Sequence, residues 1–433
     1  MSEATALVND LIDFIYESPS PFHVVANAKK RLLANGFSQL CLKEKWNLEK
    51  GGKYFTDRNG SALTAFIVGS GEVEEEGYRV VAAHTDFPSF HVKPSPEMTD
   101  NHYLKLNTEA FGSAILNTWL DRPLSLAGRV SLRSDDILHP EELLVNIKKP
   151  LLIIPNQSIH MNKKVNEGVE LNKQKDLLPL LGMTGEDFSK EGYLSRLLAG
   201  ELSVKAEDIL DFELWLYEFE KGRIIGVNDE FVCSSRLDNL TSVHAALNAL
   251  VNARPGPFTS VAVFFDDEEV GNRTKQGADS RMLYNTLERV ALAQGKGPEE
   301  FFRAVYRSFM LSCDCSHAVH PNAPEKHDPL VKPVINGGPV IKISANRNFT
   351  TDSNSSAVYQ MICERAGVPF QKFVSRSDMP GGSTIGPASV TQLDLQSIDI
   401  GSALFAMHSI RETGGVMDHH YLEKSFEEFY RQG

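Results

Sequence analysis

The sequence predicts an α/β protein whose alternating helices and strands are interrupted by a mainly β insert. Helix-forming and strand-like runs alternate in residues 1–93 and 231–433, whereas residues 94–230 hold short strands and turns. A buried apolar run, Val261–Phe265, also ends in four consecutive carboxylates at 266–269. Polar residues at strand ends mark the functional edge of an α/β sheet. We therefore expect a discontinuous α/β domain, with the insert as a second domain.

Length, composition and charge narrow the class of protein. A chain of 433 residues is too long for one ordinary core, and 42% hydrophobic with 23% charged residues is typical of soluble globular proteins. The net charge of −13 argues against nucleic acid or an anionic membrane as partner, and no apolar run is long enough to span a membrane. The N-terminal segment lacks the features of a signal peptide, and five sparse cysteines fit a reducing compartment. We expect a cytoplasmic protein.

The first part of the chain predicts two helices followed by two strands. Residues 4–17 and 22–35 have helical periodicity, and the later run 77–83 reads as a buried strand that ends at His84. A histidine at the carboxyl end of such a strand can carry chemistry, with Asp86 orienting its ring. The alternative is an ordinary strand-end histidine followed by a turn aspartate.

The insert is predicted from several short strand-like runs. Pro94 and Pro96 break the preceding pattern, and His160 falls in a polar loop where a histidine is usually only solvated. The runs that we interpret as strands are 104–112, 122–133, 148–156, 211–219 and 222–227.

Further polar residues follow apolar runs in the last part of the chain. Asp238 stands at the start of an amphipathic helix, where capping of the helix is the plain alternative. The carboxylates after Val261–Phe265 would likewise be a solvated acidic loop if they stood alone. The loop 376–387 is rich in glycine, lacks a lysine and shows no clear following helix, but its backbone N–H groups could bind a peptide end or an oxyanion. The other candidates are Glu268, Glu269, Asp314 and His408.

Together these residues predict a site for two metal ions. Strand ends of a parallel sheet meet at one edge, and a mixed set of imidazole and carboxylate ligands suits Zn²⁺, Co²⁺ or Mn²⁺. Two histidines and three carboxylates are too many for one tetrahedral zinc and fit two metals that share a carboxylate. Adjacent glutamates can serve as ligand and general base if the chain turns there, and Gly271 is consistent with a turn.

At these residues the sequence resembles the aspartyl aminopeptidase family of dinuclear zinc metallopeptidases, in a bacterial form. The resemblance implies a zinc-peptidase-like central mixed sheet flanked by helices, an inserted mainly β dimerisation domain, and a homo-oligomer assembled as a tetrahedral dodecamer. It also implies peptide substrates. The similarity runs nearly end to end and rests on AAHTD at 82–86, SSRLDNLTS at 234–242, DDEEVG at 266–271, HAVHPN at 317–322, GPVIK at 338–342, GGSTIGP at 381–387 and AMHSIRET at 406–413.

The resemblance also assigns roles to individual residues. One zinc is assigned to His84 and Asp314 and the other to Glu269 and His408, with Asp238 bridging them. Glu268 matches the general base, Asp86 the carboxylate behind the histidine, and His160 a histidine that in relatives reaches a neighbouring subunit's active site. Lys342 matches a lysine at the substrate end of the pocket, where we also expect substrate contacts from His317, Gly381 and Gly382.

Substrate preference is open at this stage. Typical family members remove N-terminal Asp or Glu, whereas a vacuolar relative prefers neutral apolar residues. Phe349 stands where animal relatives have a tyrosine, and Gly381 where a cysteine is expected. Lys342 could pair with an acidic side chain or hold only the substrate carbonyl. Two further alternatives are a deacylase of N-acyl amino acids and a metal-binding assembly protein without enzymatic activity.

Overall fold

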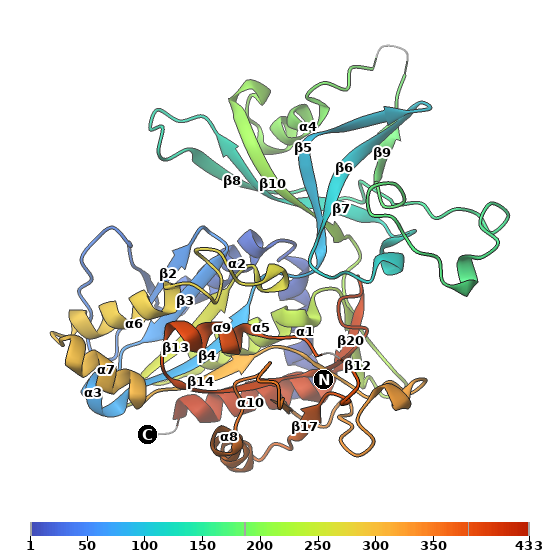
Figure 1. Cartoon of the computed structure of the whole chain (residues 1–433). Coiled ribbons are helices and arrows are strands. Elements are labelled where there is room, and N and C mark those ends of the chain that lie inside the picture. The colour runs from blue at the N-terminus through green and yellow to red at the C-terminus, as the bar shows by residue number, and fades with distance from the viewer. Residues whose placement is uncertain (1, 186–187, 380, 432–433) are drawn as a thin grey trace.

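The computed structural model describes residues 2–185, 188–379 and 381–431, and its largest element is a nine-stranded mixed sheet (Figure 1). The four central strands β13, β4, β14 and β18 run parallel, so their carboxyl ends lie at one edge. In order across the sheet the strands are β1 (Ser38–Gln39), β2 (Lys53–Arg58), β3 (Ala62–Ile67), β13 (Thr259–Phe265), β4 (Tyr78–His84), β14 (Phe309–Cys313), β18 (Gln396–Gly401), β16 (Val340–Ile343) and β17 (Gln371–Val374).

Helices cover both faces of this sheet. Every residue of β13 is buried, and its alternate side chains enter two separate cores, with Val261 and Val263 in one and Ala262 and Phe264 in the other. This is the pattern of a strand whose two faces are both covered, because side chains alternate along a strand. The helices of one face are α1 (Glu3–Tyr16), α2 (Pro21–Ala34), α5 (Leu237–Asn252), α8 (Ser353–Ala366) and α10 (Val416–Arg431); those of the other are α3 (Val73–Glu76), α6 (Met282–Ala293), α7 (Pro298–Tyr306) and α9 (Ile385–Gln392).

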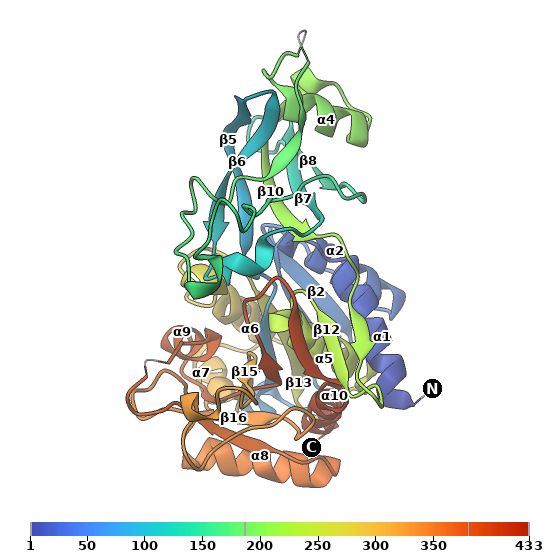
Figure 2. The ribbon, with the colours of Figure 1, turned by 90° about the vertical axis from the view of Figure 1, so that its right-hand side faces the viewer.

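A six-stranded antiparallel sheet with its own hydrophobic core lies apart from the large sheet. Figures 1 and 2 show it, together with α4, above the nine-stranded sheet. Nearly all the buried residues of this core come from within residues 94–230; Phe90, Val92 and Ile410 are the exceptions. In order across the sheet the strands are β8 (Glu141–Asn146), β7 (Leu124–Leu132), β10 (Ile209–Glu218), β5 (Ser89–Asp100), β6 (Tyr103–Phe111) and β9 (Leu180–Met183); the helix is α4 (Tyr193–Leu202).

A smaller five-stranded sheet joins segments from three parts of the chain. Its β19–β20 connection carries His408, and β15 follows Asp314 by one residue. The sheet therefore holds two of the predicted site residues beside the large sheet. Its strands, in order, are β11 (Arg223–Ile225), β12 (Phe231–Ser234), β20 (Glu412–Gly415), β19 (Ala403–Phe405) and β15 (Ser316–His317).

The predicted fold class is confirmed, with three local differences. The strand β5 continues through Pro94 and Pro96 by means of an irregularity in its register with β6, where prolines are tolerated. The run 148–156 makes only isolated bridges, because Pro150 and Pro155 at its ends cannot donate to a ladder. The run 222–227 contributes β11, which pairs with β12 outside the six-stranded sheet. The division into two domains stays a prediction.

Within the described part of the chain, none of the helices combines the length and the apolar character that crossing a membrane requires.

Candidate metal centre and substrate cavity

The parallel strands bring the predicted ligands to one edge of the large sheet. Phe265 at the end of β13 pairs in register with His84 at the end of β4, and β14 ends next to Asp314. The carboxylates at 266–269 follow β13 directly, so they lie at the same edge. His408 arrives from the five-stranded sheet, which completes a set drawn from distant parts of the sequence.

Five side chains form two clusters that share one carboxylate. His84 Nε2 lies 3.7 Å from Asp238 Oδ1 and 3.6 Å from Asp314 Oδ1. His408 Nε2 lies 3.5 Å from Asp238 Oδ2 and 3.3 Å from Glu269 Oε1. Each oxygen of Asp238 therefore faces a different imidazole, and in each cluster the potential ligand atoms all lie within 4.8 Å of one another. This is the arrangement expected for a carboxylate that bridges two ions.

The chemistry of these clusters fits bound metal. Among the described residues, His84 Nε2, Asp238 Oδ1 and Glu269 Oε1 are buried without a hydrogen-bond partner. Buried polar atoms of this kind are costly unless something pairs with them, and a divalent cation would pair with all three. Burial also raises the pKa of Glu269 well above its usual value, a cost that a nearby cation would remove. Nitrogen and oxygen donors without thiolate are ligands that zinc accepts.

Asp86 lies directly behind His84, one of the predicted ligands. Its Oδ1 lies 3.3 Å from His84 Nδ1, and its Oδ2 accepts a hydrogen bond of 3.0 Å from the backbone N–H of Glu269. Asp86 is completely buried. The backbone carbonyl of Asp86 lies 3.0 Å from His84 Nδ1 and accepts its N–H, so Nε2 of the ring faces the cluster. The carboxylate lies beside the same nitrogen and holds the backbone of Glu269.

Glu412 supports both clusters and was missed as a site residue in the sequence. It is 2% exposed; its Oε2 accepts the N–H of Asp238 at 3.0 Å and its Oε1 accepts the N–H of His408 at 2.8 Å. One carboxylate therefore positions the backbone of two ligands that are far apart in the chain. Its place four residues after His408 was visible, but no sequence signal distinguishes it from a surface glutamate.

The structure does not support the two simpler interpretations of the sequence, in which Asp238 caps a helix and residues 266–269 form a solvated acidic loop. Within the described chain, Asp238 Oδ1 accepts no hydrogen bond from the start of α5, and the Asp238 carboxylate faces the two histidines instead. Asp266 is 6% exposed, and the pKa of the Glu269 carboxyl is raised by burial, so this is not an acidic loop in water. The chain turns after β13 as expected, through Asp267 with φ of +61° and a 3₁₀ turn, Glu268–Val270.

Glu268 stands beside the clusters without belonging to either. It lines a cavity together with Asp238, Asp314 and His408. Burial raises its pKa to about 8, with further contributions from the neighbouring carboxylates. Glu268 is therefore suited to exchange protons with a reactant, because its carboxylate belongs to neither cluster, has a raised pKa and faces the cavity.

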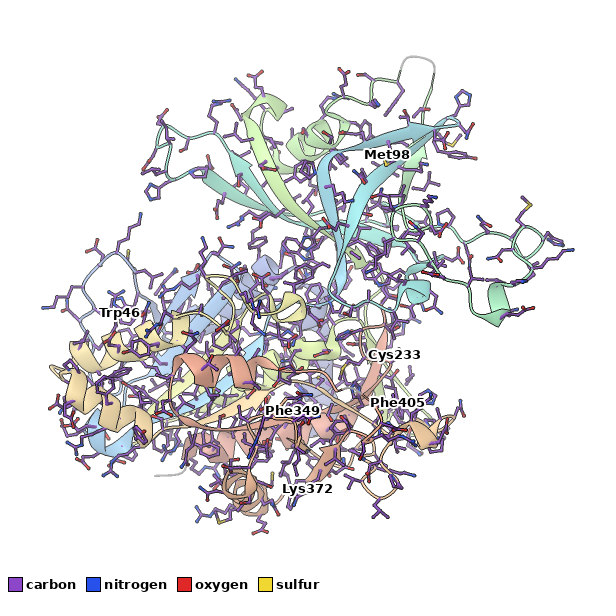
Figure 3. The ribbon with its side chains drawn as sticks, viewed as in Figure 1. Trp46, Met98, Cys233, Phe349, Lys372 and Phe405 are labelled. Carbon is purple, nitrogen blue, oxygen red and sulfur yellow. The ribbon has the colours of Figure 1, made fainter. Side chains whose placement is uncertain are left out.

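The cavity of about 500 Å³ extends from the metal clusters to a mixed wall. All four predicted substrate residues, Lys342, His317, Gly381 and Gly382, line it. Contrary to the sequence interpretation, a helix (α9) does follow the glycine-rich loop. Sequence reasoning missed further lining residues: Lys326, His327 and Phe373 lie outside the motifs it singled out, whereas Arg376, Met379 and Met407 lie within them but were not named individually. Two aromatic lining residues, Phe349 and Phe405, are labelled in Figure 3 and lie below the six-stranded sheet.

Lys342 is tied to the metal centre. Its amine donates to Asp314 Oδ2 at 3.1 Å and to the carbonyl of Cys315 at 3.0 Å, and it is 3% exposed. Although burial opposes charging, the carboxylates of Asp314 and Asp399 raise the pKa of Lys342, so the amine stays protonated. The lysine therefore presents a positive charge to the cavity while already paired with a ligand.

His160 is a predicted site residue that the single chain brings neither to the metal clusters nor to the cavity. It lies on an exposed loop, and it is absent from the described residues that line the cavity. Its predicted role requires a second subunit and stays a prediction.

Known proteins resemble this chain along nearly its whole length. Residues 14–430 match the profile of a family described as Aminopeptidase I zinc metalloprotease (M18). A probable M18 family aminopeptidase 2 of Clostridium acetobutylicum is 55% identical over 99% of this chain and 100% of its own length. A probable M18 family aminopeptidase 2 of Pseudomonas aeruginosa is 43% identical over 97% of each chain.

Solved structures agree with this result. The cryo-EM structure of the Ape4 and Nbr1 complex contains a chain that matches with a TM-score of 0.95 and 35% identity, over 99% of this chain and 86% of that one. The S. cerevisiae mApe1 dodecamer contains a chain that matches with a TM-score of 0.86 and 28% identity, over 98% of this chain and 96% of that one.

The position of Glu412 leads to a test of the metal centre. In Glu412→Gln, an amide N–H₂ would face one of the two backbone N–H groups, so one ligand loses its support. We expect zinc affinity to fall about 10- to 100-fold, measured by competition with a chelator. Glu109→Gln on exposed β6 is the control and should leave the affinity unchanged. Equal affinities in both variants would show that Glu412 does not position the ligands.

Proposed function

Because the chain belongs to the M18 family of aminopeptidase I zinc metalloproteases, we propose that this zinc aminopeptidase uses two metal ions to remove N-terminal residues, Asp and Glu before others. The observation that carries the proposal is the division of Asp238 between two imidazoles, one at each oxygen. A site with a single ion would not need a carboxylate in that position. Membership of the family establishes the peptidase class, while the number of ions and the preferred residue are our inference.

We assign the ligand residues to two metal positions. His84 and Asp314 would hold one zinc, Glu269 and His408 the other, and Asp238 would contact both. Zinc bound there supplies Lewis acidity, which polarises a peptide carbonyl and makes water more acidic. Co²⁺ or Mn²⁺ could substitute, because the donor set contains only nitrogen and oxygen.

Glu268 is our candidate for the general base. It follows the buried strand β13, lines the cavity and is not a member of either ligand cluster. Its carboxylate would take a proton from the attacking water and pass it to the leaving amine, so one residue serves as base and then as acid. Burial raises the pKa of Glu268 to about 8, which makes its ionised form a stronger base towards water. Bound cations would lower that pKa, keep the carboxylate ionised and ease release of the proton to the amine.

Preference for an acidic residue is supported by the cations of the cavity wall. Lys326, Arg376 and Lys342 line the cavity that opens from the metal clusters. A buried carboxylate of a substrate needs a cation nearby, and these side chains supply one. Phe373, Met379 and Met407 in the same wall favour a second candidate, an aminopeptidase for neutral apolar residues.

We further propose that the chain works as a homo-oligomer, with His160 completing a neighbour's site. The likeness to the mApe1 dodecamer supports such an assembly, and a tetrahedral arrangement is the form that the family resemblance implies. The loop of His160 also exposes Ile159 at 49% and Met161 at 80%, which is apolar surface that a neighbouring subunit could cover.

Hydrolysis of matched aminoacyl substrates (Asp, Glu, Leu, Ala and Lys) tests the reaction and the preference together. We expect cleavage that a chelator abolishes and added zinc restores, with Asp and Glu leading by about 10-fold or more, because they pair with the cavity cations. Cleavage led by Leu or Ala would reject the acidic preference and leave the peptidase intact. Cleavage restricted to N-acetylated substrates would favour a deacylase, and no cleavage of any substrate would favour the assembly protein.

Replacing Glu268 tests the general base. Glu268→Gln keeps the shape of the side chain but cannot accept the proton, so we expect kcat to fall about 10²- to 10⁴-fold. Zinc content should stay at the wild-type value, because the residue is not a ligand. Glu288→Gln on the surface helix α6 is the control and should keep full activity. Substantial turnover by Glu268→Gln with normal zinc would contradict the assignment.

Mixing two variants tests the role of His160 between subunits. His160→Ala and Glu268→Gln should each be nearly inactive alone. Oligomers mixed before assembly should regain about a quarter of the wild-type rate, because a site can then combine Glu268 of one chain with His160 of its neighbour. A mixture as inactive as its parents, or a fully active His160→Ala, would contradict the proposal.

A further inference from the structure

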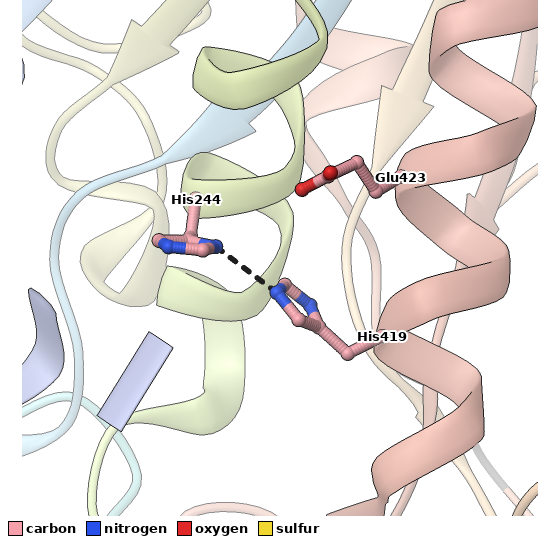
Figure 4. A group of neighbouring side chains, drawn as sticks. All are labelled: His244, His419 and Glu423. Carbon is pink, nitrogen blue, oxygen red and sulfur yellow. Dashed lines mark hydrogen bonds between the residues drawn. The ribbon is translucent and has the colours of Figure 1, made fainter. Parts of the chain in front are cut away.

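A second buried group of metal-binding side chains lies away from the cavity, between α5 and α10 (Figure 4). It contains His244, His419 and Glu423, and none of them is among the described residues that line the cavity. We propose that these three side chains form a further metal site, which binds one zinc-like transition-metal ion and has a structural role. The inference goes beyond the peptidase site, and nothing in it depends on the peptidase reaction.

The donor atoms converge at nearly the right spacing. His244 Nδ1 and His419 Nε2 lie 3.0 Å apart, as the dashed line in Figure 4 marks, and the potential ligand atoms of the three residues lie within 4.8 Å of one another. Zinc–nitrogen bonds of about 2.0–2.1 Å in tetrahedral geometry place two nitrogens about 3.3 Å apart. The two rings would need to separate by only a few tenths of an ångström, and Glu423 would move closer.

Neighbouring residues already hold two of these ligands. The other nitrogen of His244, Nε2, lies 2.9 Å from Asp10 Oδ2, a carboxylate supplied by α1. A metal-binding histidine usually has the metal at one ring nitrogen and a carboxylate at the other, because the carboxylate fixes the tautomer of the ring. Asn248 Nδ2 donates to Glu423 Oε2 at 3.1 Å, which leaves the other oxygen of Glu423 available.

The charges in this region allow a cation. His244 is completely buried and His419 is 1% exposed, and burial lowers the pKa of both, so each ring is neutral with a lone pair to offer. Burial raises the pKa of Glu423 to about 7, and a bound cation would favour its ionised form. Arg31 brings one positive charge to within 3.3 Å of His244, and its two hydrogen bonds of 2.8 Å to Asp10 offset that charge.

A metal at this place would join three helices from opposite ends of the chain. Asp10 belongs to α1, His244 to α5, and His419 and Glu423 to the final helix α10. Three protein donors leave one position for water, and the burial of the cluster excludes larger ligands. Without metal, a direct hydrogen bond would join the two rings instead. Zinc counts distinguish the metal-bound state from this hydrogen-bonded state.

Counting zinc per chain tests the site while the catalytic centre is disabled. In His84→Ala/His408→Ala, one imidazole is removed from each catalytic cluster. After dialysis against buffered zinc, we expect about one more zinc per chain in this double variant than in the same variant carrying His419→Gln. Elemental analysis gives the count, and thermal unfolding with and without zinc should show stabilisation only where His419 is present. Equal counts and equal melting temperatures would overturn the proposal.

Single variants of the otherwise intact protein give an independent measurement. His419→Gln keeps an amide N–H for His244 Nδ1 but is a poor metal ligand, so we expect it to lose about one zinc per chain and retain peptidase activity. Glu423→Gln should do the same, which guards against one variant failing to fold. The control His420→Gln, one residue along the same helix, should keep the wild-type count.

Unchanged zinc in folded His419→Gln and Glu423→Gln would reject this site whatever the peptidase assays give. A wild-type protein without peptidase activity would reject the proposed function and leave these zinc counts intact.

Discussion

The structure depends on a concentration of buried negative charge around Asp238. Asp314 and Glu269 approach this carboxylate from two sides, with Glu268 beside them, and two imidazoles and Lys342 lie close enough to moderate their repulsion. Carboxylates without compensation would be expelled to solvent or protonated. The parallel strands instead hold the carboxylates at one edge of the sheet. Much of the fold around that edge therefore preserves a site suited to divalent cations.

Lys342 connects this centre to the substrate cavity. Its ammonium pairs with the oxygen of Asp314 that does not face His84, so a metal ion bound beside His84 would leave that pair in place. Although burial acts in the other direction, Lys342 lowers the pKa of Asp314 and keeps it ionised. The charge of the cavity wall and the basicity of a metal ligand are therefore set by the same ion pair.

The structure brings the predicted ligands together because most of them follow recognisable strands. His84, Asp314 and Glu269 each stand at the end of a buried apolar run, and parallel strands bring such ends together. Glu412 and Lys326 could not be found in this way, since neither follows a strand and their contacts come from distant segments. The second histidine cluster escaped for a related reason: His244 and His419 lie inside helices, where a buried histidine looks like any other core position.

The six-stranded sheet has a direct connection with the ligands. The carbonyl of Ser113, just after β6, lies 3.2 Å from His408 Nδ1 and leaves Nε2 of that ring for metal. A side chain at Gly112 would meet Glu269 at 3.1 Å, so the backbone of the insert packs closely against a second ligand. Both contacts involve the cluster of His408 and Glu269. The geometry of the His408 cluster is therefore coupled to the packing of the insert against the large sheet.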